Sequence, residues 1–460
     1  MIETDYLVIG AGAAAMAITD ALLTHTDATV TMVDRRHTPG GHWVDAYPYV
    51  RLHQPSAFYG VGSTPLGQDA IDVTGLNAGY YELANADDIR SYFGRVMQHR
   101  FLSSGRVSYF PNCEHLGEQR FGSRLTASTW EVNVKRKTID TTYLEGDIPA
   151  TSPPTFEVAD GVRCVPAGAL ARLDQRPDNF VVIGAGKTAI DTCVWLLEQG
   201  VEPDSIRWVK PREGWWLNRR FYQPHTLLPD LYRGIAIQLE AMVQATSIHD
   251  LYARLEDQRF FLRIDTAVEP SMVRGAVISE SELELVRRIK NVIRLGHVQK
   301  IGQDTITLDQ GRVSTNLQTL HIHCAARGLP RPALRPIFEP GRITVQPFMW
   351  GFASYQFALL GAAEALLDND ADKNKLFPPI AYWDSNEDYL RAFLANMAHD
   401  RARAAYPALA NWAKTSRLNP LGEIGRHSGN PSVLESRELI KRYGAEAAGK
   451  LVTLLRPKVN

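Results

Sequence analysis

The sequence has little cysteine, and none of it is arranged for chemistry. The 460 residues include four cysteines, Cys113, Cys164, Cys193 and Cys324, which lie far apart. Because no Cys-x-x-Cys motif and no pair at zinc-ligand spacing occurs, the sequence argues against a dithiol redox centre and against a cysteine zinc site. We expect four free thiols, most of them buried.

The sequence also lacks an excess of charge of one sign, and it lacks long apolar runs. Fifty Lys and Arg residues against 51 Asp and Glu leave a formal net charge of −1, whereas a nucleic-acid-binding protein needs a basic surface for phosphates. No apolar run is long enough to cross a bilayer, and Glu3 and Asp5 stand where a secretory signal carries basic residues. We therefore expect a cytoplasmic protein without nucleic-acid or membrane partners.

A complete strand–helix–strand unit for binding a dinucleotide stands almost at the start of the chain. An apolar strand at residues 6–9 runs into G-x-G-x-x-A, formed by Gly10, Gly12 and Ala15, and a second strand ends at Asp34. Gly10 permits the tight turn, Gly12 lets the backbone approach a pyrophosphate, and Ala15 keeps the helix close to the strand. The helix N-terminus offers N–H groups to the diphosphate, and Asp34 is placed to accept a ribose hydroxyl.

A second unit of the same kind begins near residue 179. Residues 179–183 form its strand, Gly184 and Gly186 its turn, and Lys187 and Thr188 the start of its helix. The Gly-Lys-Thr end resembles a P-loop, but the first glycine of that motif would fall inside the strand, so ATP binding is not expected. We expect Lys187 and Thr188 to face the diphosphate of a second dinucleotide.

Basic residues follow the next strand of the second unit. Lys210 and Arg212 stand where Asp34 stands in the first unit. A carboxylate there would repel a 2′-phosphate, whereas Lys and Arg attract one. The pattern therefore favours NADPH over NADH at the second site.

The segment after the first unit contains Arg35 and then Gly40-Gly41-His42-Trp43. The order of motifs resembles that of the flavin-containing monooxygenases and the Baeyer–Villiger monooxygenases: a dinucleotide fold, then Gly-Gly-x-Trp, then a second dinucleotide fold. The resemblance implies that the first fold holds FAD, with these five residues beside the cofactor.

The same resemblance implies an α/β protein with two Rossmann-like domains, in which an NADPH domain interrupts the FAD domain. We place the FAD-binding domain at residues 1–165 and 301–368, and the NADPH-binding domain at 166–300. Helical patterns predict a helical insertion at about 221–293 and a polar, helical C-terminal extension at 369–460, to which no chemistry is assigned.

Two late segments complete the predicted cofactor contacts. Gly328 lies where the resembling families carry Ala-Thr-Gly as the chain returns to the FAD domain, and Gln346 precedes a helix that the resemblance directs at the isoalloxazine ring. His321 and His323 share one face of a strand while Cys324 points away, and no third ligand is near, so no metal is expected.

The segment after Gly-Gly-x-Trp contains the candidate catalytic residues Arg51, His53 and Gln54. Baeyer–Villiger enzymes show a similar Tyr-Pro…Arg stretch with an acid two residues beyond the arginine, where this sequence has His53. Flavin-containing monooxygenases place a side-chain amide near the flavin edge, a part that Gln54 can take, and Arg51 can hold negative charge on reduced flavin or its peroxide. An alternative with equal support is that Arg51 and His53 only bind FAD phosphate or backbone.

Three functions remain open. The first is a monooxygenase that uses a flavin C4a-hydroperoxide and molecular oxygen on a small organic substrate. The second is a flavin dehydrogenase or reductase without a stable peroxide. Two departures leave room for it: the Baeyer–Villiger fingerprint F-x-G-x-x-x-H is missing at residues 156–163, and sequences beginning at Thr141 and Ala325 replace Ala-Thr-Gly. The third is a nucleotide-binding protein without turnover. Pocket shape decides the substrate, and a homodimer is left open.

Overall fold

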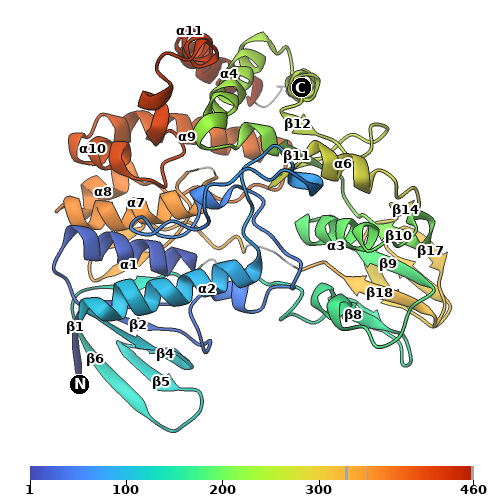
Figure 1. Cartoon of the computed structure of the whole chain (residues 1–460), viewed down its shortest axis with the longest axis horizontal. Coiled ribbons are helices and arrows are strands. Elements are labelled where there is room, and N and C mark those ends of the chain that lie inside the picture. Colours follow the sequence, from blue (N-terminus) through green and yellow to red (C-terminus); the bar gives the residue numbers. More distant parts are fainter. Residues whose placement is uncertain (144, 327–329, 350, 457–460) are drawn as a thin grey trace.

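The structure is a computed structural model and describes residues 1–143, 145–326, 330–349 and 351–456. The predicted cofactor contact Gly328 lies outside these residues. Two sheets with helices dominate the molecule, one at the left and one at the right of Figure 1, and further helices lie above them.

The first sheet has at its centre the strand that the dinucleotide motif predicts. Its main path runs β19-β20-β6-β1-β2-β3, and β1 pairs in parallel with β2 and with β6. The strands are β1 (Ile2–Ile9), β2 (Val30–Val33), β3 (Val107–Phe110), β6 (Thr129–Asp140), β19 (Phe338–Glu339) and β20 (Arg342–Thr344), with β4 (Cys113–Gly117) and β5 (Arg120–Ser123) beside β6. The helices of this domain are α1 (Ala13–His25), α2 (Ala86–Val96) and α7 (Ala353–Leu366).

Helices α1 and α7 approach each other closely because a glycine lies between them. A Cβ atom at Gly361 would stand 2.7 Å from the carbonyl oxygen of Ile18, so only glycine fits there. The pairing brings the late part of the chain back onto the first sheet. This is the interrupted arrangement of the first domain that the sequence predicts.

The second sheet is wholly parallel and has the order β14-β10-β9-β18-β8. Its strands are β8 (Cys164–Pro166), β9 (Asn179–Ile183), β10 (Ile206–Val209), β14 (Val292–Ile293) and β18 (Thr319–His323), and helix α3 (Lys187–Glu198) follows β9. A separate small sheet contains β7 (Glu157–Val158), β15 (Val298–Ile301), β16 (Thr305–Leu308) and β17 (Gly311–Ser314). The prediction of two Rossmann-like domains is confirmed.

The predicted domain boundary at residues 300 and 301 does not match the strand pairing. Strand β18 pairs with β9 and with β8, so the chain stays in the second domain through His323. Strand β7 already pairs with β15, so the second domain also begins before residue 166. The apolar pattern of a single buried strand does not reveal which sheet it joins, and this is the reason for the difference.

The predicted insertion is mixed and not purely helical. Helices α4 (Leu228–Gln244), α5 (Ile248–Asp257) and α6 (Glu280–Val286) accompany a sheet of the order β12-β11-β13. The strands of this sheet are β11 (Gly214–Asn218), β12 (Phe261–Leu262) and β13 (Met272–Ile278). Because side chains alternate along a strand, Trp215 joins the core of the first domain and Trp216 that of the second. The insertion therefore connects the two cores.

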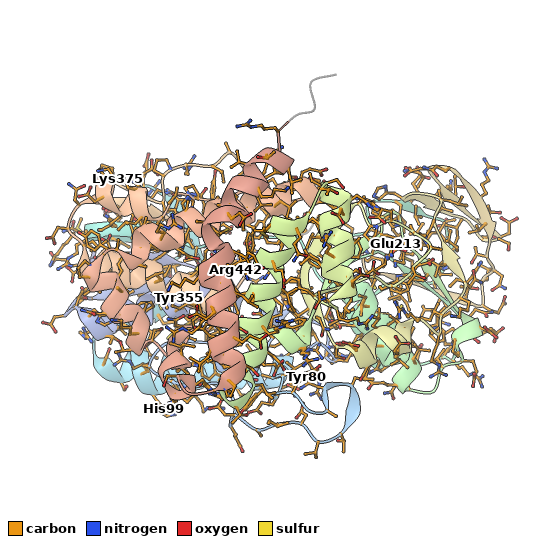
Figure 2. All side chains as sticks on the ribbon, turned by 90° about the horizontal axis from the view of Figure 1, so that it is seen from above. Tyr80, His99, Glu213, Tyr355, Lys375 and Arg442 are labelled. Carbon is orange, nitrogen blue, oxygen red and sulfur yellow. The ribbon has the colours of Figure 1, made fainter. Side chains whose placement is uncertain are left out.

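The C-terminal extension is helical, as predicted, but it also contributes to the core. It contains α8 (Asp370–Leu376), α9 (Asn386–Ala404), α10 (Pro407–Thr415) and α11 (Pro431–Leu454). Its buried side chains, among them Tyr389, Leu409 and Leu451, join the core of the first domain. Helix α11, which carries the labelled Arg442, lies along α4 of the insertion (Figure 2). None of the helices in the described ranges has the length and apolar character needed to span a membrane.

Candidate active site

The first glycine-rich turn is held in place by a second pair of glycines. Gly10 has a φ of +103°, and Gly41 has a φ of +59°, conformations that favour glycine. A Cβ atom on Gly41 would lie 2.9 Å from the Cα atom of Gly12. Two motifs that are separate in the sequence therefore form one backbone contact, at the N-terminus of α1.

A cavity of about 690 Å³ opens in front of this turn. This volume lies in the range of pockets that hold cofactors and small ligands. The predicted site residues that line it are Gly10, Gly12, Asp34, Arg35, Gly41, His42, Trp43, His53 and Gln54. The structure thus brings together most of the contacts that the sequence predicts for FAD.

Asp34 lies in the cavity wall with its carboxylate already oriented by the backbone. One oxygen accepts the N–H of Ala11 at 2.6 Å, and the other accepts the N–H of Arg36 at 2.7 Å. Burial raises the pKa of Asp34 despite these hydrogen bonds. Each carboxylate oxygen keeps acceptor capacity for a further donor, so the arrangement is compatible with a ribose hydroxyl.

The aromatic part of the wall comes from residues that the chain brings together from three segments. The indole N–H of Trp43 donates to the hydroxyl of Tyr59 at 2.7 Å, and the rings meet edge to face. Tyr382, in the C-terminal extension, also lines the cavity. The sequence offered no signal for Tyr382, because the extension carries no recognisable motif.

Three predicted contacts near the turn do not line this cavity. Ala15 is buried where α1 packs on the sheet, and Gly40 lies behind Gly41 with a φ of +134°. The side-chain amide of Gln346 is turned away and bonds to the backbone of Arg335, as donor at 2.9 Å and as acceptor at 3.3 Å. Its neighbours Val345 and Pro347 line the cavity in its place.

Arg51 also lies outside the cavity lining, although it was predicted to face the flavin. Its side chain is exposed, and its backbone bridges to Asn85. Its positive charge acts on Glu198, at the end of α3 in the second domain. The chain bends at His53 and Gln54, so Arg51 does not share the surroundings of the residues that follow it.

His53 is half-buried at the cavity and borders both domains. Its Nδ1 accepts the N–H of Val277 at 3.4 Å, and its carbonyl accepts a hydrogen bond from Arg219 at 3.4 Å. Desolvation and the positive charges of Lys187 and Arg219 lower the pKa of His53 to about 3. A neutral imidazole that accepts at Nδ1 carries its proton on Nε2, so His53 is a neutral donor.

The second glycine-rich turn is followed by a network of buried charges. Gly184 has a φ of +139°, Gly186 precedes α3, and Lys187 and Thr188 begin that helix. Lys187 forms an ion pair with Asp191 and lies 3.6 Å from Glu282. The ammonium predicted to face a diphosphate therefore already has two carboxylate partners.

Glu282 connects this network to the insertion. Arg219 binds it at 2.6 Å, and the N–H of Ser279 donates to it at 2.6 Å in a capping box at the start of α6. The cations Arg219 and Lys187, together with Ser279, lower the pKa of Glu282 to about 2, although desolvation acts in the opposite direction. The spacing Ser-x-x-Glu was the sequence signal for this residue.

Lys210 and Arg212, the basic residues that follow β10, differ from each other in their surroundings. Lys210 is buried, its Nζ lies 2.6 Å from Glu213, and it stands over the ring of Trp208. Arg212 binds Asp384 of the C-terminal extension at 2.9 Å. Lys210 is thus neutralised inside the domain, and only Arg212 retains partial exposure.

Arg274 is a basic residue that sequence reasoning missed. It lies in β13 beside Gly214, because β13 pairs with β11. Its Nε is buried without a hydrogen-bond partner in the part of the chain that the structure describes. Burial and the charge of Arg212 lower its pKa to about 10. A cation in these surroundings is available to an anion.

The two histidines of β18 have ordinary structural partners. His321 contacts the hydroxyl of Thr315 at 2.9 Å and the carbonyl of Arg163 at 3.1 Å, and His323 contacts the carbonyl of Ser152 at 3.1 Å. Across the described ranges, no group of three or more potential ligands is placed to hold a metal ion.

Comparison with known proteins gives relatives in sequence and more distant likenesses in structure. No family model matches the chain. The chain is similar to solved structures of a flavin monooxygenase variant from Stenotrophomonas maltophilia (12% identity, 80% of this chain, 100% of that chain, TM-score 0.47) and of an oxidised steroid monooxygenase bound to NADP (14%, 97%, 98%, 0.48). It is also similar to a bacillithiol disulfide reductase from Bacillus cereus (11%, 79%, 98%, 0.44). Scores this low carry no argument about function.

The sequence relatives are far closer. Uncharacterised proteins of Mycobacterium tuberculosis and Mycobacterium bovis are each 43% identical over 424 residues, which cover 92% of this chain and 79% of theirs. The protein therefore belongs to the family that these mycobacterial proteins represent.

Proposed function

We propose that the protein is an FAD-dependent oxidoreductase that takes electrons from NADPH and oxygenates a small organic substrate. The observation that carries this proposal is the cavity at the Gly12–Gly41 contact, with Asp34 in its wall. Bound FAD would supply the redox chemistry, and the chain would bind, orient and shield it.

Each part of the wall has a role in this proposal. The N-terminus of α1 and the bare backbone of Gly12 would hold the diphosphate, and Asp34 the ribose. Trp43 and Tyr59 close the wall with a hydrogen bond of their own and so limit the entry of water. His53 and Gln54 bring two neutral donors, which can meet negative charge without supplying a proton.

The proposed NADPH site lies at the end of β10. Arg212 and Arg274, whose Nε has no partner in the described ranges, would attract the 2′-phosphate, while Lys210 is held by Glu213. Arg212→Ala and Arg274→Ala should each raise the KM for NADPH roughly tenfold and leave that for NADH nearly unchanged. Arg288→Ala, an exposed arginine of the same domain, is the control. Equal or better reduction of the flavin by NADH would contradict the choice of donor.

Flavin content tests the central part of the proposal. The purified protein should be yellow and should release FAD when it is denatured. Asp34→Ala should weaken FAD retention, whereas Asp257→Ala, at an exposed position, should not. A colourless protein that also fails to bind added FAD would refute the proposal and favour a nucleotide-binding protein without turnover.

One observation favours a second candidate, a flavin dehydrogenase or reductase. Arg51, the residue predicted to hold negative charge on an oxygenated flavin, lies outside the cavity lining. The two candidates separate when the enzyme is reduced with NADPH without oxygen, mixed with oxygen and followed by flavin absorbance. A monooxygenase shows an intermediate before oxidised flavin returns and incorporates oxygen into product. Direct return to oxidised flavin with every candidate substrate supports the reductase.

A further inference from the structure

A single arginine of the C-terminal extension binds the backbone of a loop in the first domain. Arg417 lies between α10 and the turn at residues 422–427. Its guanidinium donates to the carbonyl oxygens of Ala57, Tyr59 and Val61 at 2.8 Å and of Thr64 at 3.0 Å, and its Nε donates a second bond to Val61 at 3.1 Å. All three nitrogens of the group thereby donate to the loop.

The loop held in this way is part of the flavin cavity. Its residues Phe58 and Tyr59 line the cavity, and Tyr59 accepts the hydrogen bond from Trp43. Next to Arg417, the hydroxyl of Tyr92 accepts the N–H of Val61 at 2.8 Å and donates to the carbonyl of Thr64 at 2.7 Å. Tyr92 and Arg417 thus fix the loop together, and it presents Phe58 and Tyr59 to the cavity.

The chemistry of this contact requires arginine. The half-buried charge is met by neutral carbonyl dipoles, with no carboxylate bonded to it in the described ranges, and desolvation lowers its pKa. Lysine has one compact ammonium with three donors and cannot reach four carbonyls in this plane. Desolvation of this cation has a cost, which its hydrogen bonds to the loop offset.

We propose that Arg417 is a positioning residue of the flavin site, which acts through the loop at residues 57–64 on Tyr59 and Trp43. This inference rests on the proposed flavin function. It implies that the C-terminal extension, which has no sequence motif of its own, completes the cofactor cavity and that flavin binding and docking of the extension support each other.

The test measures the flavin in the holoprotein. Arg417→Ala should speed the release of FAD upon dilution by about tenfold or more and change the visible circular dichroism of the bound flavin. Arg417→Lys should behave in the same way, because it keeps the charge but not the contacts. Arg426→Ala is the matched control, because this arginine of the same extension is exposed and, within the described part of the chain, pairs only with Glu423. Release and spectra like those of the wild type in a folded Arg417→Lys protein would overturn the inference.

A double-mutant cycle separates positioning from general stability. Tyr59→Phe removes only the hydroxyl that accepts from Trp43. If Arg417 acts through Tyr59, the effects of Arg417→Lys and Tyr59→Phe on FAD release should be less than additive, and additive effects would count against it.

Hydrogen exchange distinguishes failure of this inference from failure of the proposed function. The amides of residues 57–64 should lose protection in Arg417→Lys and keep it in Arg426→Ala, whether or not flavin is bound. If the wild type binds no FAD, the proposed function fails and the flavin part of the inference fails with it, while this measurement still decides the contact with the loop. Unchanged protection would refute that contact.

Discussion

The two glycine-rich turns of the molecule share a backbone design and differ in what stands before them. Each joins a buried parallel strand to the N-terminus of a helix, at Gly10 and Gly12 in one case and at Gly184 and Gly186 in the other. The first turn faces a cavity of about 690 Å³. The second is followed at once by Lys187, whose ammonium is bound by carboxylates.

The difference teaches that the motif determines the shape of the turn and other segments determine its use. Gly41 lies against Gly12 and leaves the helix N-terminus free for a ligand. Glu282 and Arg219, both from the insertion, place charges beside the second turn instead. A dinucleotide at the second turn must therefore meet an ordered set of ion pairs, whereas one at the first turn meets backbone.

The largest expected effect comes from breaking the network at the second turn. Glu282→Gln removes the charge that Arg219 and Lys187 share and leaves these two cations incompletely compensated. The free energy of unfolding should fall by about 3–5 kcal/mol, measured by denaturant titration. The control Glu284→Gln affects an exposed pair with Arg287 and should cost less than about 1 kcal/mol. Equal effects of the two variants would contradict the picture of a buried network.

The next effect breaks the first turn. Gly41→Ala forces a left-handed residue to carry a Cβ and pushes this atom against Gly12. The left-handed conformation of an alanine at this position should lower the free energy of unfolding by about 1–2 kcal/mol. The contact of its Cβ with Gly12 should in addition lower FAD retention. Gly105→Ala is a matched control, because Gly105 has a φ of +69° and open space at the Cβ position. If both variants retain FAD equally well, the glycine contact does not shape the site.

Asp34, at the first turn, and Glu282, beside the second, should change the stability of the protein in opposite directions as the pH changes. The pKa of Glu282 is lowered to about 2, so the stability it contributes is present above its unfolded pKa of about 4.5 and is lost as pH falls toward 2. The pKa of Asp34 is raised by burial, so the cost of its charge appears as pH rises through the folded value. As the pH falls from 6 to 3, the loss in free energy of unfolding caused by Glu282→Gln should become smaller. The gain in free energy of unfolding caused by Asp34→Asn should become smaller as well. Parallel pH profiles would contradict these assignments.

The smallest effects are expected from the cysteines. Burial raises the pKa of Cys164 to about 11 and of Cys324 to about 12, and it raises the pKa of Cys193 well above its usual value. These thiols remain protonated at neutral pH and are poor nucleophiles. Single replacement of Cys113, Cys164, Cys193 or Cys324 by Ser should leave flavin reduction by NADPH intact, in assays with matched flavin content. Loss of turnover in one such variant, with FAD bound and the fold retained, would show that a thiol takes part.

Much of the candidate site could be predicted because its signals are local. The glycines, the strands that precede them and Asp34 act within one strand–helix–strand unit, where backbone conformation follows from neighbouring residues. The Gly40–Gly41 pair was also predicted to lie at the cofactor, and Gly41 lines the cavity. Such assignments need no knowledge of how distant segments pack.

For other assignments, the surroundings that decide the outcome come from elsewhere in the chain. Lys210 looks like a phosphate ligand until Glu213 is found 2.6 Å away in a buried pair. Arg51 looks like a flavin contact, but its side chain is exposed and its charge acts on Glu198. Strand β18 looks like a return to the first domain, but it pairs with β9. A charge pattern specifies what a residue can bind, and packing specifies what it does bind.

The sequence by itself determined that two dinucleotide-binding turns exist and that the first is followed by an acid and a glycine pair, because glycine conformation and apolar periodicity act over a few residues. Only the tertiary structure decided that Arg274 lies beside the second unit, with an Nε that has no partner among the described residues, and that Arg417 holds the loop at residues 57–64. Arg417 reaches that loop from more than 350 residues away, and its partners are backbone carbonyls that every residue carries. Such a contact depends on the position of the chain and not on the identity of the partner residues, so no local pattern can reveal it.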